Sequence, residues 1–288
     1  MHALRMNNLP TERQAAVIAS LVEGNSIRAT VRMTGVAKDT VIKLLARVGV
    51  ACAEYQRNTL RNLPCKRIQC DEIWSFCYAK EKNVPAEMRG HFGYGDVWTW
   101  TALCADTKLI ASWRVGRRSA WDAQHFMYDL AGRLANRVQL TTDGHGVYLT
   151  AVDLAFGTEV DYAMLVKLYG RDPRDKESRY SPAECIGAVP TVVTGRPNRR
   201  HISTSYVERQ NLTMRMSMRR FTRLTNAFSK KVENHQHALA LYFMYYNFCR
   251  VHQTLRVTPA MEAGVSDHVW ELSEVVGLLS SQARQKAA

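Results

Sequence analysis

Three acidic residues stand far apart in the chain, each at a place from which a folded sheet could bring it to a common site. Asp71 lies in QCDEIWSF, Asp143 in LTTDGHGVY and Glu208 in TSYVERQN. Carboxylates are the protein ligands that hard divalent cations prefer, and two such ions about 3.5 to 4 Å apart can stabilise both the attacking and the leaving oxygen of a phosphodiester transfer. We therefore predict that Asp71, Asp143 and Glu208 are catalytic residues that hold two Mg²⁺ ions, for which Mn²⁺ can substitute.

The surroundings of each acid support this interpretation. Asp71 interrupts an apolar segment, where a charged side chain is costly unless it is paired or coordinated. Asp143 directly follows a short apolar run, at the carboxyl end where α/β sheets place their ligands. Glu208 shares a predicted helix face with Asn211 and Arg215. Each signal alone also has an ordinary explanation, a helix cap or a surface ion pair, so the weight rests on the three together.

Other acids compete for the same roles. Glu72 competes with Asp71, but alternation along a strand points the two side chains to opposite faces. Asp153 and Asp161 compete with Asp143, yet Asp153 falls in the middle of a predicted helix, and neither stands at a turn that ends a strand.

The elements that must position these acids follow from periodicity and turn residues. Runs rich in β-branched and aromatic residues predict five strands, over 67–78, 97–104, 109–115, 138–142 and 159–162. Helical spacing predicts helices over 120–136, 146–156, 204–220, 231–250 and 267–279. Four of the eight prolines fall within 171–200, which predicts an irregular insertion. The order of the elements predicts an α/β fold, a mixed five-stranded sheet with helices on its faces.

The first 50 residues predict an all-α helix-turn-helix region. A helix over 11–23 is followed by a short one after Ser26, by a turn at Gly35, and by helical spacing over 37–48. The second helix of such a motif enters the major groove. We predict that DNA is contacted by Arg28, Arg32, Lys38, Thr40, Lys43 and Arg47. An ordinary helical hairpin with a solvated basic face remains the alternative.

The charge balance favours a polyanionic partner. The chain has 39 Lys and Arg against 26 Asp and Glu, a net charge of +13 and an isoelectric point near 9.6, and nucleic acid is the leading candidate. We find no apolar stretch long enough for a membrane helix and no signal-peptide pattern at the start, so we expect a cytoplasmic protein with no membrane partner. The seven cysteines form no C-x-x-C pair, which argues against a zinc site.

We divide the chain into four parts. Residues 1–50 are the predicted helix-turn-helix region, 51–66 a linker, 67–264 the catalytic domain and 265–288 a C-terminal helix and tail.

The three acidic blocks, together with YNFCRVHQTL and TPAMEAG downstream, resemble the signature of DDE transposases from bacterial insertion sequences, relatives of retroviral integrases. The resemblance spans roughly Ile68 to Gly264. It implies an RNase H-like fold with the first Asp on the central strand, the second just after a neighbouring strand and the Glu on a later helix. It also implies cleavage by water at the ends of a mobile element, attack of the freed 3′-hydroxyl on target DNA, and a homo-oligomer that brings two ends together in the bacterial nucleoid.

Residues outside the triad follow from the resemblance less directly. His145 would contact the scissile phosphate or order its loop, and Arg209, Asn211 and Arg215 would position DNA. The chain lacks the Cys-rich zinc ribbon of some relatives, which leaves recognition of the ends to the helix-turn-helix and the linker. Two other functions remain open, a helix-turn-helix transcriptional regulator whose acids are incidental, and an RNase H-like nuclease that cuts without joining.

Overall fold

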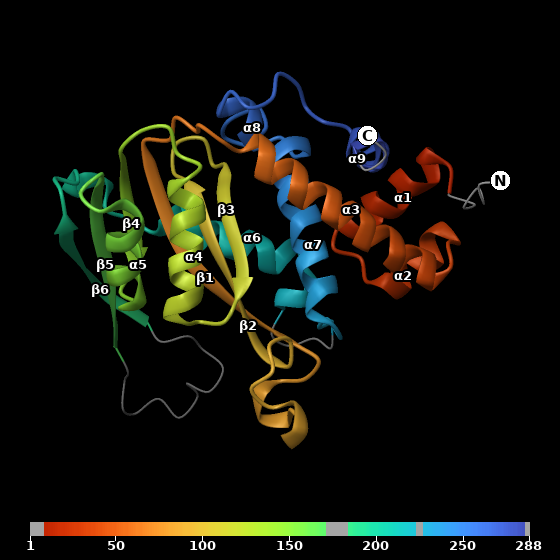
Figure 1. Ribbon diagram of the computed structural model, residues 1–288, viewed down its shortest axis with the longest axis horizontal. Helices are drawn as coiled ribbons and strands as arrows, with labels where there is room; N and C mark the ends of the chain where they lie inside the picture. The colour runs from red at the N-terminus through yellow and green to blue at the C-terminus, as the bar shows by residue number, and fades with distance from the viewer. Residues whose placement is uncertain (1–8, 171–183, 223–226, 286–288) are drawn as a thin grey trace. The chain divides into compact units, whose positions relative to one another are not determined.

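The computed structural model describes residues 9–170, 184–222 and 227–285, which form an α/β structure around a six-stranded sheet (Figure 1). The strand order is β3-β2-β1-β4-β5-β6. The strands are β1 (Arg67–Cys77), β2 (Gly95–Cys104), β3 (Ile110–Gly116), β4 (Val138–Asp143), β5 (Val160–Gly170) and β6 (Glu184–Thr194).

The sheet is mixed, as the order of the elements predicts. β2 and β3 form the expected antiparallel pair. β1 is parallel to β4, with Cys70 opposite Thr142, and β4 is parallel to β5. Because Asp71 and Asp143 are the next residues along their strands, the pairing of β1 with β4 brings these two backbone positions side by side on the two central strands of the sheet.

The sixth strand corrects the five-stranded prediction. Residues 171–200 were expected to be irregular, but β6 occupies Glu184–Thr194 and pairs antiparallel with β5; residues 171–183 of that insertion lie outside the described residues. Pro190 and Gly187 concealed the strand, since both residues are unfavourable inside a sheet. β6 tolerates a proline because it is an edge strand, where one row of backbone N–H groups needs no partner in the sheet.

The described residues divide into two compact units, and the whole predicted triad falls in one of them. That unit comprises Arg61–Ile73 and Trp98–Asn211. In it, α4 (Ala120–Ala131) and α5 (Val147–Phe156) lie side by side against one face of the sheet (Figure 1). The Ser112 hydroxyl of β3 donates to Asp129 of α4 at 2.6 Å, which fixes this helix on the sheet.

The start of α6 (Ser205–Ser217) is fastened to the central strand β1. The side-chain oxygen of Gln69 accepts hydrogen bonds from the backbone N–H groups of Tyr206 and Val207, at 2.9 and 3.1 Å. Free N–H groups at a helix start need such partners. Gln69 therefore holds the first turn of α6, and with it Glu208, next to the strand that carries Asp71.

The other unit comprises Met1–Leu60, Trp74–Val97 and Leu212–Ala288. Its helices are α1 (Thr11–Val22), α2 (Ile27–Thr34), α3 (Lys38–Thr59), α7 (Val232–Met244), α8 (Pro259–Glu262) and α9 (Leu272–Gln285). A π-helical turn over Tyr245–Cys249 follows α7, and short 3₁₀ helices occupy Glu81–Asn83, Ala86–Met88, Arg199–His201 and Arg219–Phe221, of which Arg199–His201 belongs to the unit that carries the triad.

The segment expected to be a linker is largely helical. α3 runs on to Thr59 because it packs along α7, where the Gln56 side chain donates to the Ala240 carbonyl at 3.0 Å. A Cβ added at Gly49 would lie 2.5 Å from the Cβ of His237, so glycine allows the two helices to approach this closely. The structure also groups the chain after 212 with the N-terminal helices, whereas we placed it in one catalytic domain with residues 67–211.

Within the described residues, no helix is both long enough and apolar enough to cross a membrane.

Candidate metal centre

Three carboxylates converge where β1 and β4 run side by side. One ligand oxygen from each of Asp71, Glu72 and Asp143 lies within 4.8 Å of the other two. The structure thus brings together Asp71 and Asp143, as the sequence predicts, and adds Glu72, which strand alternation had assigned to the opposite face. Alternation fixes only the direction of the Cα–Cβ bond, and the longer Glu side chain still reaches the cluster.

Asp71 is held from two sides. One carboxylate oxygen accepts the backbone N–H of Glu72 and the other accepts the Asn211 side-chain amide, both at 2.8 Å. Burial, followed by the charges of Glu72 and Asp143, raises the pKa of Asp71 to about 7. The position is therefore fixed while the charged form is unfavourable, as expected for a ligand that awaits a cation.

Glu72 is the most buried member, with a side chain 1% exposed. Its Oε2 lies 3.1 Å from the Arg118 Nε, and its Oε1 has no hydrogen-bond partner among the described residues. Burial raises the pKa of Glu72 to about 7, although the Tyr148 hydroxyl and Arg118 both favour the charged form.

Asp143 ends β4 and is open to solvent, with a side chain 34% exposed. Its Oδ1 accepts the backbone N–H of His145 at 3.0 Å, and its Oδ2 lies 3.8 Å from the Arg118 Nη2. The Arg118 guanidinium also stacks over Trp98 at 4.8 Å. The Arg118 guanidinium thus lies close to the carboxylates of both Glu72 and Asp143, and Trp98 packs against it.

Glu208 lies near the cluster but is engaged elsewhere. Its carboxylate accepts hydrogen bonds from Lys167 and, at 2.6 Å, from the Thr204 hydroxyl. Its charge still contributes to the raised pKa of Asp71, as the weakest of the causes. Asn211, one turn further along α6, reaches Asp71 directly, so the helix presents the face that carries Glu208 toward β1.

The donor set fits a hard divalent cation. The cluster supplies carboxylate oxygens, and the side-chain oxygens Glu72 Oε1 and Asn211 Oδ1 are buried without a hydrogen-bond partner among the described residues. Buried polar atoms rarely lack a partner, and Mg²⁺ and Mn²⁺ take oxygen ligands. Asp71, Asp143 and either Glu72 or Glu208 would hold the metal.

The crowding of these acids predicts an unusual dependence of stability on pH. Asp71 and Glu72 have pKa values of about 7 in the folded chain against ordinary values of 3.8 and 4.5. Between these values the folded state binds more protons than the unfolded one, so the stability that these groups contribute is complete below about pH 4 and is lost as the pH rises through 7. With EDTA present, Asp71→Asn should raise the Tm at pH 8 by roughly 3 °C or more and leave it nearly unchanged at pH 4. This shift follows from the size of the chain, for which one kcal/mol of stability corresponds to about 2 to 4 °C in Tm.

Differential scanning fluorimetry would check this, with the exposed Asp153→Asn on α5 as the matched control. Mg²⁺ should then stabilise the wild type at pH 8 but not Asp71→Asn. Identical Tm curves for wild type and Asp71→Asn, with and without Mg²⁺, would contradict a strained metal-binding cluster.

The predicted DNA-contacting side chains lie on three helices. Six of them lie on α2 and α3, and all six side chains are exposed: Arg28, Arg32, Lys38, Thr40, Lys43 and Arg47. On α6, Arg209 is exposed, Arg215 is half-buried, and Asn211 is buried against Asp71. Gly35 has a positive φ of 65° at the turn between α2 and α3, as the sequence predicts. Contact between these residues and DNA stays a prediction.

His145 is placed between the cluster and the core. Its ring lies nearly parallel to that of Trp100, with a centroid distance of 6.5 Å, and burial, together with the charge of Arg118, lowers its pKa. The backbone N–H of His145, not its imidazole, contacts Asp143, and the choice between its two predicted roles stays a prediction.

Sequence reasoning missed Arg118 and Lys167, the two cations that pair with the acids. Arg118 stands among Arg114, Arg117 and other basic residues, and nothing in its spacing singles it out. Lys167 lies 41 residues before Glu208, and only the pairing of strands and helix brings the two together.

No family model matches the chain, and a search of curated proteins finds no match either. Among solved structures, the chain is similar to a cryo-EM structure of the piggyBac transposase synaptic complex with hairpin DNA, with a TM-score of 0.40 and 9% identity over 100% of this chain and 75% of that one. It is also similar to the crystal structure of the Mos1 strand transfer complex, with a TM-score of 0.25 and 12% identity over 84% and 78% of the two chains.

Proposed function

We propose that the protein is a DNA transposase of the DDE type, with an RNase H-like catalytic region and a helix-turn-helix that binds the ends of a mobile element. The observation that carries the proposal is the convergence of Asp71 and Asp143 on adjacent parallel strands, with buried oxygen atoms that lack hydrogen-bond partners among the described residues. The net charge of +13 supports a nucleic-acid substrate.

The catalytic set of the proposal is Asp71, Asp143 and Glu208. Bound Mg²⁺ or Mn²⁺ supplies charge stabilisation for the attacking and leaving oxygens of the phosphodiester. The chain's own residues orient this set: Asn211 fixes the Asp71 carboxylate, and the His145 backbone fixes that of Asp143. If these carboxylates were not already fixed, part of the free energy of metal binding would be lost in ordering their side chains.

Arg118 and Lys167 hold the acids in the absence of substrate. Arg118 lies between Glu72 and Asp143, and Lys167 pairs with Glu208. Both are only partly buried, with side chains 39% and 28% exposed, so each is available to a DNA phosphate that enters the site. Synapsis of two ends requires at least two copies of the chain, and a homo-oligomer is therefore part of the proposal.

A strand-transfer assay tests the proposal. Purified protein is incubated with labelled DNA that carries the gene's flanking ends and an unlabelled target plasmid, in Mg²⁺, Mn²⁺ or EDTA. We expect cleavage and joined products with either metal and neither in EDTA. Metal-dependent cleavage without joined product would identify a nuclease, and binding without cleavage in either metal would favour a transcriptional regulator.

A further inference from the structure

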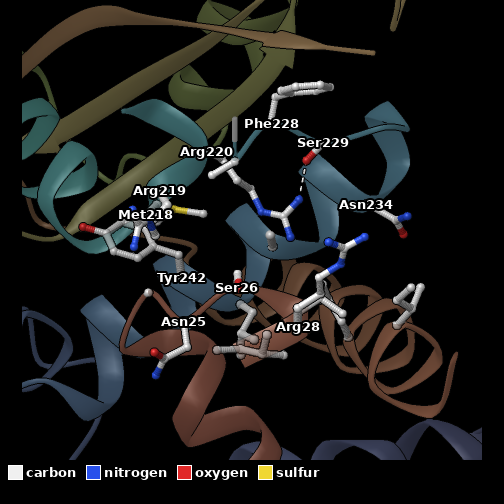
Figure 2. A pocket seen from close by; sticks show the side chains of 18 of the residues that line it. Asn25, Ser26, Arg28, Met218, Arg219, Arg220, Phe228, Ser229, Asn234 and Tyr242 are labelled. Atoms are coloured by element: carbon white, nitrogen blue, oxygen red, sulfur yellow. Dashed lines mark hydrogen bonds between the residues drawn. The ribbon is translucent and has the colours of Figure 1, made fainter. Parts of the chain in front are cut away.

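A cavity of about 1030 Å³ lies in the unit that contains the N-terminal helices, and none of Asp71, Glu72 and Asp143 lines it. It is bounded by the start of α2, the 3₁₀ turn Arg219–Phe221 and the first turns of α7 (Figure 2). Its lining contains no Asp or Glu among the described residues and six cations, Arg28, Lys38, Arg219, Arg220, Lys230 and Lys231. So many like charges around one cavity create a strongly positive potential.

Arg220 is the most constrained of these cations. Its guanidinium donates a hydrogen bond to the hydroxyl of Ser229, whose carbonyl in turn accepts the Tyr78 backbone N–H at 2.8 Å. No carboxylate in the described part of the chain forms a salt bridge with Arg220. Burial lowers the pKa of this guanidinium, but arginine stays charged at neutral pH. A partly desolvated cation without a counter-charge favours an anionic ligand.

Arg28 faces Arg220 across the cavity. In Figure 2 the two guanidinium groups point toward one another, Arg28 from α2 and Arg220 from the opposite wall. Arg28 is exposed and likewise forms no salt bridge within the described ranges. α7 begins nearby at Val232, and its N-cap residue Lys231 provides no side-chain hydrogen bond to the first N–H groups. Two facing guanidinium groups repel one another, and an anion between them would turn that repulsion into two attractions.

Part of the remaining lining is apolar, beside the polar residues Asn25, Ser26, Ser217, Ser229 and Asn234. The apolar part includes Leu21, Ile42 and Leu241, together with the ring of Phe228, over which Lys230 lies at 4.9 Å from the centroid. A small inorganic anion would leave this apolar surface uncovered. A ligand that combines a phosphate with a flat, weakly polar group would use both parts, and aromatic side chains are common partners of unpaired bases.

We propose that this cavity binds a nucleotide unit of a DNA strand, with its phosphodiester between Arg28 and Arg220 and its base or sugar against Phe228. The inference rests on the proposed function for its choice of DNA as the partner. It assigns DNA contact to Arg219, Arg220 and residues 228–231, about 170 residues after the predicted helix-turn-helix region, and joins them with Arg28 in one binding site.

The test is fluorescence anisotropy with labelled duplex and single-stranded DNA across a salt series, for the wild type, Arg28→Gln, Arg220→Gln and the double variant. Each single substitution should weaken binding about tenfold or more, as expected for a charge-assisted contact. The slope of log affinity against log salt should become shallower by about 0.7 to 0.9 for a lost phosphate. If both side chains hold one phosphate, the second substitution should cost less once the first is made.

The exposed Lys82→Gln removes the same charge outside the cavity lining and is the matched control. Unchanged affinity and slope in Arg28→Gln, which is exposed and should fold normally, would overturn the inference. Strictly additive effects in the double variant would also overturn it. A cleavage assay distinguishes failure of this inference from failure of the proposed function. If the wild type binds DNA through the cavity but does not cut it, only the transposase proposal is contradicted.

Discussion

Asp143→Asn is expected to abolish metal-dependent DNA cleavage, with a rate at least about a thousandfold below that of the wild type. Metal ligation contributes several kcal/mol of charge stabilisation, and each 1.4 kcal/mol is about tenfold in rate. The substitution is conservative for the structure, because the Asn side-chain oxygen can still accept the His145 backbone N–H. Single-turnover cleavage of end-labelled duplex in Mg²⁺ measures the effect.

The control for this variant is Asp153→Asn, which lies on the same unit and is exposed. Both variants should bind DNA with wild-type affinity in EDTA, so a lost rate cannot be attributed to lost binding. Cleavage by Asp143→Asn at the wild-type rate would show that the cluster is not the catalytic site.

Glu208→Gln should have a smaller but still large effect, about a hundredfold or more on the cleavage rate, whereas Glu72→Gln should lower the rate about tenfold or less. Glu208 is 37% exposed and paired with a flexible lysine, so it can exchange that partner for a cation. Glu72 is almost completely buried and already neutralised by Arg118. A catalytic ligand must meet both the metal and the incoming DNA, which favours Glu208.

The two variants together decide which acid completes the site. Cleavage rates and Mn²⁺ affinity by isothermal titration calorimetry should fall further in Glu208→Gln than in Glu72→Gln. The reverse order would assign the third ligand to Glu72 and leave Glu208 as a partner of Lys167. Lys167→Met provides a check, since it removes the competing cation and should not impair metal binding.

The elements with strong periodicity could be predicted from the sequence. The apolar run around Asp71, the short strand that ends at Asp143 and the antiparallel pair β2 and β3 were confirmed because burial dictates both their pattern and their length. The edge strand β6 could not be recognised, since its residues are exposed and its pattern carries no sign of a core-facing side. The continuation of α3 beyond Val48 depends on contact with α7, in which the Ala240 carbonyl lies 184 residues after Gln56.

The site was predictable only in part for a similar reason. Backbone position follows from strand pairing, which placed Asp71 and Asp143 on neighbouring strands. The partners of each acid depend on side-chain packing. Glu72 reaches the cluster because its side chain is long, and Arg118 and Lys167 pair with the acids through contacts between segments distant in the sequence. Local sequence contains no information on such pairs, because each depends on the complete fold.

The edge strand β6 also bears on how the protein behaves at high concentration. Ile186, Val189, Val192 and Val193 are all exposed on it, next to a row of backbone groups at the margin of the sheet. Such an edge invites another chain to add a strand, which leads to aggregation. Pro190, in the middle of the strand, cannot donate to an incoming strand and so acts as a gatekeeper against it. The residue that concealed this strand in the sequence therefore opposes the pairing of a second chain with this edge.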